Sequence, residues 1–191
     1  MIAAGLSAAG HKTGRFISPH VESFRERVAV NGTPIAEAQV VDFVRAAREL
    51  VAASGGAVQP PPAFFEWTLA LALSEFARQR THSAVFEAGV GGASDATHAL
   101  PNVELVVLTN VDLDHVDVLG PTLELIAADK AGAIRPGTPV VSGVTQPHLQ
   151  KLVAREAHRS SAPLHQVRAE GTVSTGLFHV PPELAGVFSP T

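Results

Sequence analysis

Apolar residues recur along the chain at two spacings, one typical of helices and one typical of short buried strands. Apolar positions three to four residues apart predict the helices, which are residues 1–10, 35–53, 64–80, 122–134 and 150–160. Short apolar runs between them predict the strands, which are residues 16–17, 83–87, 104–109, 139–142 and 163–167. Because strands alternate with helices, the pattern predicts an α/β fold in three layers, a mostly parallel sheet with helices on both faces.

The composition is typical of one globular domain and excludes several other classes of protein. The 191 residues are 46% hydrophobic and 17% charged, which suits a packed core. We expect one domain over residues 1–170, followed by an irregular C-terminal segment at 171–191. The net charge is −4 without a Lys/Arg block, no apolar run has the ~20 residues of a membrane span, and cysteine is absent. We therefore expect a cytoplasmic protein that binds neither nucleic acid nor membrane and has no thiol or disulfide chemistry.

Polar residues follow three of the predicted strands at their carboxyl ends, where open α/β sheets bind ligands. Ser18 and His20 follow the first strand, and Glu87 opens a glycine-rich stretch after the second. Residues 110–117 follow the third with three carboxylates and His115. Carboxylate oxygens suit Mg²⁺, and an imidazole can complete a mixed site. The alternatives are a plain strand-to-helix turn for the glycines and a solvated acidic loop for the last run.

Two further groups have simple structural interpretations. Lys130 lies within a predicted helix and, from the pattern alone, is an exposed helical lysine. The aromatic residues Phe64, Phe65, Trp67 and Phe76 fall in a strongly apolar helix, so we expect them in the core.

A series of motifs runs in order along residues 1–163. They are FISPH at 16–20, FRERVAVNG at 24–32, FFEWTLALA at 64–72, FEAGVGGASDAT at 86–97, and the Asp-His and Asp-Lys-Ala-Gly motifs within 114–137. This series resembles the folylpolyglutamate synthase/dihydrofolate synthase family of the Mur ligase superfamily. The resemblance implies the central, P-loop NTPase-like domain of such a ligase.

The resemblance also implies a reaction. ATP would phosphorylate a carboxylate of folate or dihydropteroate, and the amine of glutamate would attack the acyl phosphate, with Mg²⁺ neutralising the phosphates. The metal and nucleotide ligands of the family would fall on Ser18, Glu87 and His115. His115 and Lys130 would be catalytic positions, because Lys130 matches the lysine that is carbamylated in the family and then helps to organise the magnesium site.

The resemblance implies a substrate site as well. Phe65 and Asp95 match residues on the pterin side of the folate, and Arg27 and His20 lie close to the same region. We expect folate or dihydropteroate, glutamate and ATP as the small-molecule partners.

The chain departs from the family pattern in its phosphate-binding loop. The family sequence GTNGKGS has no counterpart, and no Gly-x-x-x-x-Gly-Lys-Ser/Thr run occurs anywhere. We therefore expect a fragment, truncated at both ends, that is inactive alone and self-associates through an uncovered sheet edge. The alternatives are a non-catalytic remnant that acts as a binding or interaction module, and a Mur-type ligase for another carboxylate.

Overall fold

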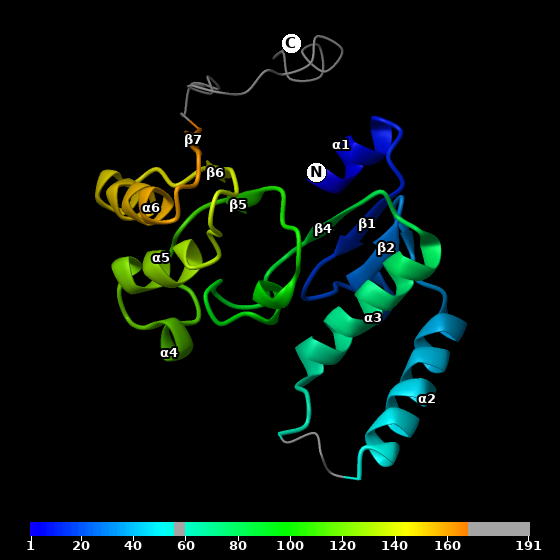
Figure 1. The fold of residues 1–191 in the computed structure, drawn as a ribbon. Helices are drawn as coiled ribbons and strands as arrows, with labels where there is room; N and C mark the ends of the chain where they lie inside the picture. Colours follow the sequence, from blue (N-terminus) through cyan, green and yellow to red (C-terminus); the bar gives the residue numbers. More distant parts are fainter. Residues whose placement is uncertain (56–59, 168–191) are drawn as a thin grey trace. The chain divides into compact units, whose positions relative to one another are not determined.

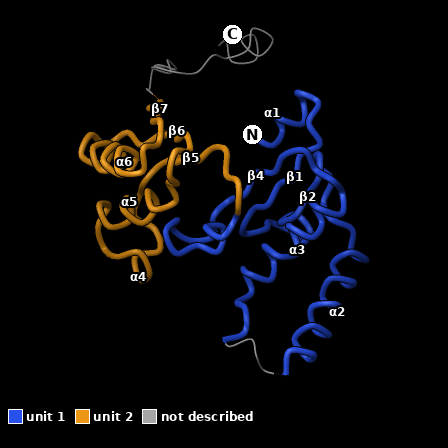
Figure 2. The backbone as a smooth tube through the Cα atoms, viewed as in Figure 1, with its two compact units in different colours: residues 1–100 blue, residues 101–191 orange. Residues whose placement is uncertain are grey.

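The computed structural model describes residues 1–55 and 60–167, and these fall into two compact units. The first unit is Met1–Leu100 and the second begins at Pro101 (Figure 2). Each unit is described by itself. The segment expected to be irregular, 171–191, lies outside the described residues. The boundary at residue 100 falls inside the range expected as one domain, and that domain assignment stays a prediction.

The first unit is built on a four-stranded sheet of order β3-β2-β1-β4 (Figure 1). Its strands are β1 (Thr13–Phe16), β2 (Val28–Val30), β3 (Thr33–Pro34) and β4 (Ser83–Phe86). β1 is parallel to β4 and antiparallel to β2, which is antiparallel to β3. The tight turn between β2 and β3 uses Asn31 and Gly32 at φ 49° and 79°, as an Asn-Gly pair favours.

Three helices and two short 3₁₀ turns accompany this sheet. They are α1 (Ile2–Ala8), η1 (Phe24–Arg27), α2 (Glu37–Ala53), α3 (Phe64–Gln79) and η2 (Ala96–Ala99). Figure 1 shows α1 and α3 on opposite sides of the sheet, while α2 and α3 extend away from it together. The core forms between α3 and β1, where Phe76 packs so closely on Gly14 that a Cβ there would lie 2.8 Å from the ring.

The second unit holds a parallel sheet of order β5-β6-β7. Its elements are β5 (Val106–Leu108), α4 (Val116–Leu119), α5 (Leu123–Ala131), β6 (Val140–Ser142), α6 (Pro147–Arg159) and β7 (Leu164–Gln166). A continuous core unites the sheet with α5 and α6 and includes the fully buried Ile126, Val140 and Leu149. α6 begins three residues before the predicted helix because Pro147 suits the first turn, where no N–H needs a partner.

The α/β class predicted from the sequence is confirmed, and both units combine strands with helices. The hydrogen-bonded strands form two sheets, of which the first is mixed and the second parallel. The prediction that residues 83–87 form a buried strand is wrong, since β4 is half-buried at the edge of its sheet. In the described part of the chain, no helix is both long and apolar enough to cross a membrane.

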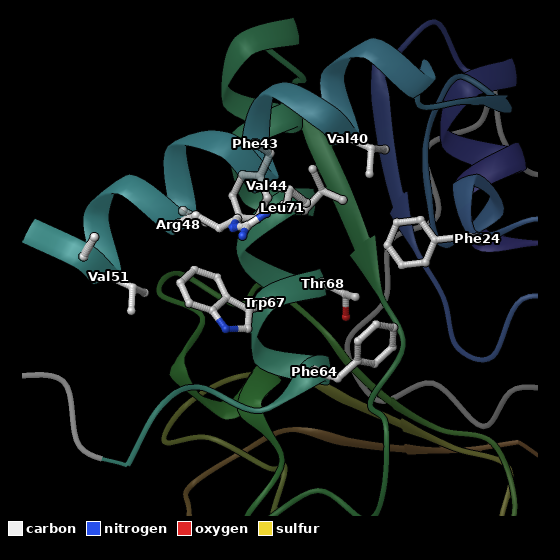
Figure 3. A pocket seen from close by; sticks show the side chains of 12 residues that line it. Phe24, Val40, Phe43, Val44, Arg48, Val51, Phe64, Trp67, Thr68 and Leu71 are labelled. Atoms are coloured by element: carbon white, nitrogen blue, oxygen red, sulfur yellow. The ribbon is translucent and has the colours of Figure 1, made fainter. Parts of the chain in front are cut away.

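Burial of the aromatic residues on α3 differs from the expectation. Phe76 is buried, with 5% of its surface exposed, as predicted. Phe64 is 63% exposed, so its assignment to the core is wrong, and Phe65 and Trp67 are only half-buried. The reason is that Phe64 is the first residue of the helix and its ring packs against Phe24 and Arg27 of η1 (Figure 3).

Glu75 is a buried carboxylate among the mostly apolar buried residues of α3. Only 6% of its surface is exposed. The Arg78 guanidinium donates to both carboxylate oxygens at 2.8 Å, and the Gln79 amide donates at 3.1 Å. The hydrogen bonds from Arg78 hold the pKa of Glu75 below its ordinary value of 4.5, although burial acts in the opposite direction. A folded-state pKa that is lowered stabilises the fold above the ordinary value, and this contribution disappears as the pH falls through the lowered value.

We expect Glu75→Gln to lower the free energy of unfolding by about 1–2 kcal/mol at pH 7, because it removes the charge that pairs with Arg78 and leaves an imperfect buried partner. The difference from the parent chain should shrink as the pH falls from 7 to below the lowered pKa of Glu75, where the carboxyl itself becomes protonated. Urea unfolding at both pH values measures this. Asp42→Asn breaks an exposed pair with Arg45 and should cost less than about 0.5 kcal/mol. The prediction would be contradicted if Glu75→Gln lost as little stability as Asp42→Asn, or if its loss did not depend on pH.

Candidate functional site

The ends of β1 and β4 bring Ser18 and Glu87 together. The two strands are parallel neighbours with Phe16 opposite Phe86, so the segments that follow them leave from the same edge of the sheet. The Ser18 amide donates to Glu87 Oε2 at 2.9 Å, and the Glu87 amide donates to the Phe16 carbonyl at 2.9 Å. The Glu87 side chain is exposed and Ser18 is half-buried. This arrangement leaves the carboxylate fixed by one hydrogen bond and open to a ligand.

Glu26 fixes the loop after β1 through hydrogen bonds to its backbone. Its carboxylate accepts hydrogen bonds from the amides of Val21, Glu22 and Ser23, and with Ser23 it forms a capping box on η1. These bonds, first that from Val21, hold the pKa of Glu26 below its ordinary value. The sequence interpretation missed Glu26, although the Ser-x-x-Glu spacing of residues 23–26 is the signature of a capping box.

His20 and Arg27 form a polar pair beside two phenylalanine rings. Arg27 Nε donates to His20 Nδ1 at 2.9 Å, so Nδ1 is the acceptor and Nε2 carries the proton of the neutral ring. The Arg27 guanidinium carbon lies 5.4 Å from the centroid of the Phe64 ring, within cation–π range. Phe24 packs edge-on against both His20 and Phe64, at centroid distances of 6.2 Å. Two of the four residues predicted to bind substrate, His20 and Arg27, are therefore in direct contact with each other.

Asp95 shapes the glycine-rich loop after β4. One carboxylate oxygen accepts from the amides of Gly89 and Val90 at 2.9 and 3.2 Å, and the other accepts from the Thr97 amide at 2.8 Å, which caps η2. The Phe65 ring packs so closely on Gly89 that a Cβ there would lie 2.8 Å from it. Asp95 is buried and engaged by its own loop, and the substrate contact assigned to it stays a prediction.

His115 and Lys130 belong to the second unit. His115 precedes α4 in a left-handed conformation at φ 50°, and its Nε2 lies 3.6 Å from an oxygen of Asp114. α4, a short helix that begins inside the acidic run 110–117, was not predicted. Lys130 is half-buried in the last turn of α5, so it is less exposed than the pattern alone indicated. The meeting of His115 with Ser18 and Glu87 stays a prediction.

The Ser18 and Glu87 side chains fit the ligand preference of magnesium. A hydroxyl and a carboxylate are hard oxygen donors, and Mg²⁺ commonly binds one or two carboxylates while waters and substrate phosphates complete its shell. Among residues 1–55 and 60–167, no cluster of three or more His, Asp or Glu side chains is arranged to hold a metal by itself. The donors present thus suit an ion brought in with a phosphate substrate better than a closed structural site.

Sequence comparison places the chain among known proteins. No protein-family model matches it. It is 36% identical over 163 residues to a dihydrofolate synthase/folylpolyglutamate synthase of Bacillus subtilis, and this alignment covers 85% of the chain and 38% of the relative.

Comparison with solved structures gives the same relationship. A complex of folylpolyglutamate synthase with AMPPCP and folate matches 86% of this chain and 40% of its own, with TM-score 0.81 and 33% identity. The Mycobacterium tuberculosis folylpolyglutamate synthase, solved with ADP and AMPPCP, matches 88% of this chain and 39% of its own, with TM-score 0.80 and 34% identity.

This chain spans about two fifths of the length of these proteins, since the matched shares of their chains are 38 to 40%. The sequence alignment and the structural matches each cover at least 85% of this chain. Over the part that they share, the chain belongs to the folylpolyglutamate synthase/dihydrofolate synthase family.

Proposed function

We propose that this chain is the part of an ATP-dependent ligase that handles the nucleotide and the folate during addition of glutamate to folate or dihydropteroate. The contact between Ser18 and Glu87 at the ends of β1 and β4 carries the proposal, because the Ser18 amide holds an exposed carboxylate where α/β sheets bind phosphates. The ADP and AMPPCP of the related structures support ATP as the nucleotide, and the bound folate supports the class of acid substrate.

The reaction consistent with this proposal has two steps. The γ-phosphoryl group of ATP passes to a carboxylate oxygen of the folate, and ADP leaves. The amine nitrogen of glutamate then attacks the acyl carbon, phosphate leaves, and the amine loses a proton to give the amide. Mg²⁺ supplies charge neutralisation on the transferring phosphoryl group when it is bound.

The residues of this chain would have separate roles in this reaction. Glu87 and Ser18 would hold the ion together with His115, and Lys130, as a carbamate, would add negative charge to that site. Arg27 and His20 would bind the substrate beside Phe64 and Phe24, with which they pack. Phe65 and the loop fixed by Asp95 would form the pterin side of the site.

A chimera tests the proposed activity. Residues 1–167 would replace the matching segment of the Bacillus subtilis relative, which supplies the remaining parts of the ligase. Glutamate addition to folate or dihydropteroate by this chimera, measured by product mass, is the expected result. A folded chimera that binds nucleotide and forms no product with either acid would overturn the proposal and favour a ligase for another carboxylate.

We expect the 191-residue chain by itself to show no glutamate-dependent ATP turnover. It contains no Gly-x-x-x-x-Gly-Lys-Ser/Thr run, so it lacks the lysine and the glycine-loop amides that hold a triphosphate. Phosphate release measured with folate, with and without glutamate, checks this, and the active chimera is the positive control. Glutamate-dependent release by the chain alone would contradict the expectation. Folate binding by the chain, with an inactive chimera, would instead favour a non-catalytic binding module.

Self-association is proposed as a property of the isolated chain. β4 ends the hydrogen-bonded order of the first sheet, and β1 beside it is largely buried. A strand at a sheet edge presents free amides and carbonyls to another chain. We expect light scattering to report species larger than 19.9 kDa whose mass rises with concentration. A molecular mass that stays at that of the monomer at every concentration measured would contradict the proposal.

A further inference from the structure

In the second unit, the loop after β6 is fixed by side-chain amides from two other segments. β5, β6 and β7 are parallel, so the loops that follow them leave from one edge of the sheet. The Val144 carbonyl accepts a hydrogen bond from Gln150 Nε2 of α6 at 2.9 Å and another from Gln166 Nε2 of β7 at 2.7 Å. The Val144 side chain is fully buried in the core of this unit. A residue that extends from this loop therefore has a rigid support.

Gln146 extends from this loop and holds the neighbouring loop, which follows β5. Its Nε2 donates to the Val111 carbonyl at 3.1 Å, across 35 residues of sequence. Gln146 is also the N-cap residue of α6, yet its side chain makes no capping hydrogen bond. Serine, threonine, aspartate and asparagine are preferred at an N-cap, because their short side chains reach the amides of the first turn. The Gln146 side chain therefore serves the loop after β5 rather than its own helix.

The bond from Gln146 falls where the chain leaves the core of the unit. The Val111 side chain is 4% exposed and packs in the core, whereas residues 112–118 are all exposed. Two aspartates of this loop accept hydrogen bonds from the amide of the next residue, which shapes the loop locally. Core packing fixes the side chain of Val111, and the bond from Gln146 fixes the plane of the peptide group that follows it. Because a peptide group is planar, this plane sets the direction in which the chain continues to His115.

We propose that Gln146 is a positioning residue for His115, which it orients through the Val111 carbonyl. The inference rests on the proposed function, in which His115 holds the magnesium ion together with Ser18 and Glu87. Gln146 itself would touch neither the substrates nor the ion. Removal of a group that orients a metal ligand typically weakens metal binding about 10- to 100-fold, because the ligand then adopts other orientations.

The first test measures the Mg²⁺ requirement of the active chimera at neutral pH. Gln146→Glu keeps the length of the side chain and replaces the donor with an acceptor, and Gln146→Ala removes the donor without adding a charge. Both should raise the Mg²⁺ concentration for half-maximal rate about tenfold, while the rate at saturating Mg²⁺ stays within about threefold of the parent. A loss of stability alone would not separate the two quantities, since it lowers the amount of active protein at every Mg²⁺ concentration.

Gln150→Glu and Gln150→Ala are the matched controls. Gln150 lies one turn further along the chain and makes the same kind of bond, but the Val144 carbonyl keeps its second donor, Gln166, when Gln150 is replaced. The control variants should leave the Mg²⁺ requirement within about twofold of the parent. An equal shift in the Gln150 variants would overturn the inference. A shift in Gln146→Glu without one in Gln146→Ala would also overturn it, because the effect would then come from the added charge.

A second readout uses the 191-residue chain and needs no activity. A protease that cleaves before aspartate can attack the exposed loop at the three aspartates of residues 112–117. Asp42, an exposed residue of α2 in the first unit, is the internal reference site. Gln146→Ala should speed cleavage within 112–117 severalfold relative to cleavage at Asp42, since a loop that opens more often is cut faster. Gln150→Ala should leave this ratio unchanged.

The two readouts separate failure of this inference from failure of the proposed function. An active chimera whose Mg²⁺ requirement stays the same in Gln146→Ala would overturn the inference and leave the proposed function standing. Unchanged cleavage within 112–117 would overturn it as well, because Gln146 would then not hold the loop. A parent chimera that forms no product with either acid would instead overturn the proposed function, and the role of Gln146 in that reaction with it.

Discussion

Replacing Gly143 with alanine should lower the free energy of unfolding by about 3 kcal/mol. Gly143 follows β6 directly, and its amide donates to the Leu108 carbonyl at 2.8 Å where β5 ends. A Cβ at this position would lie 2.4 Å from the carbonyl oxygen of Thr109. This neighbour is backbone, so it cannot rotate away, and the ends of β5 and β6 would have to separate. The change would also displace the start of the segment that leads to His115.

Gly5 provides the matched control for this substitution. It lies within α1, and a Cβ there would meet nothing within 4 Å. Gly5→Ala should raise the free energy of unfolding by up to about 1 kcal/mol, because alanine loses less backbone freedom in a helix. Denaturant unfolding of both variants separates a steric effect from a general effect of added methyl groups. Equal stability of Gly143→Ala and the parent chain would show that β5 and β6 are not held this closely.

The close approach of β6 to Thr109 was not visible in the sequence. Gly143 lies after a short apolar run and reads as an ordinary loop glycine, with no positive φ to mark it in the structure. Periodicity located the helices and strands because each needs an apolar face of its own spacing. It could not show which glycine touches a neighbouring backbone, since that depends on where two segments 30 or more residues apart meet.

The elements predicted from periodicity are confirmed where an apolar face is long and regular. α3 and α5 lie within the ranges 64–80 and 122–134, and β5, β6 and β7 fall inside their predicted runs. The short elements η1, η2 and α4 were missed because four residues are too few to show a period. Periodicity also identified the apolar face of α2, yet it could not tell a buried face from one that lines an open groove.

The candidate site likewise combines features that the sequence could indicate with features that it could not. β1 and β4 end at the same edge of their sheet, and the 2.9 Å hydrogen bond from the Ser18 amide to Glu87 places two of the three expected ligands side by side. The site that they would form with His115 stays a prediction. The pairing of His20 with Arg27 was only expected as proximity, because a direct hydrogen bond depends on the path of the loop between them. That path is fixed by Glu26 and its three backbone donors, which were not recognised.

Glu87→Gln should lower the rate of glutamate addition by the chimera on the order of 100-fold. Glutamine keeps a side-chain oxygen that can accept the hydrogen bond from the Ser18 amide, so the loop after β1 should keep its position. The substitution removes only the negative charge that is proposed to hold Mg²⁺ against the phosphates of ATP. The variant should therefore need more Mg²⁺ for half-maximal rate while its free energy of unfolding stays within about 0.5 kcal/mol of the parent.

Glu22→Gln is the control for loss of a charge near the site. Glu22 is an exposed residue of the loop after β1, and only its backbone amide takes part in the hydrogen bonds that fix this loop. Its substitution should leave both the rate and the Mg²⁺ dependence unchanged. A Glu87→Gln chimera with a rate within threefold of its parent, at the same Mg²⁺ requirement, would contradict a role for Glu87 as a metal ligand. The Ser18–Glu87 contact would then have a structural role alone, because the hydrogen bond that both residues share survives the substitution while the charge does not.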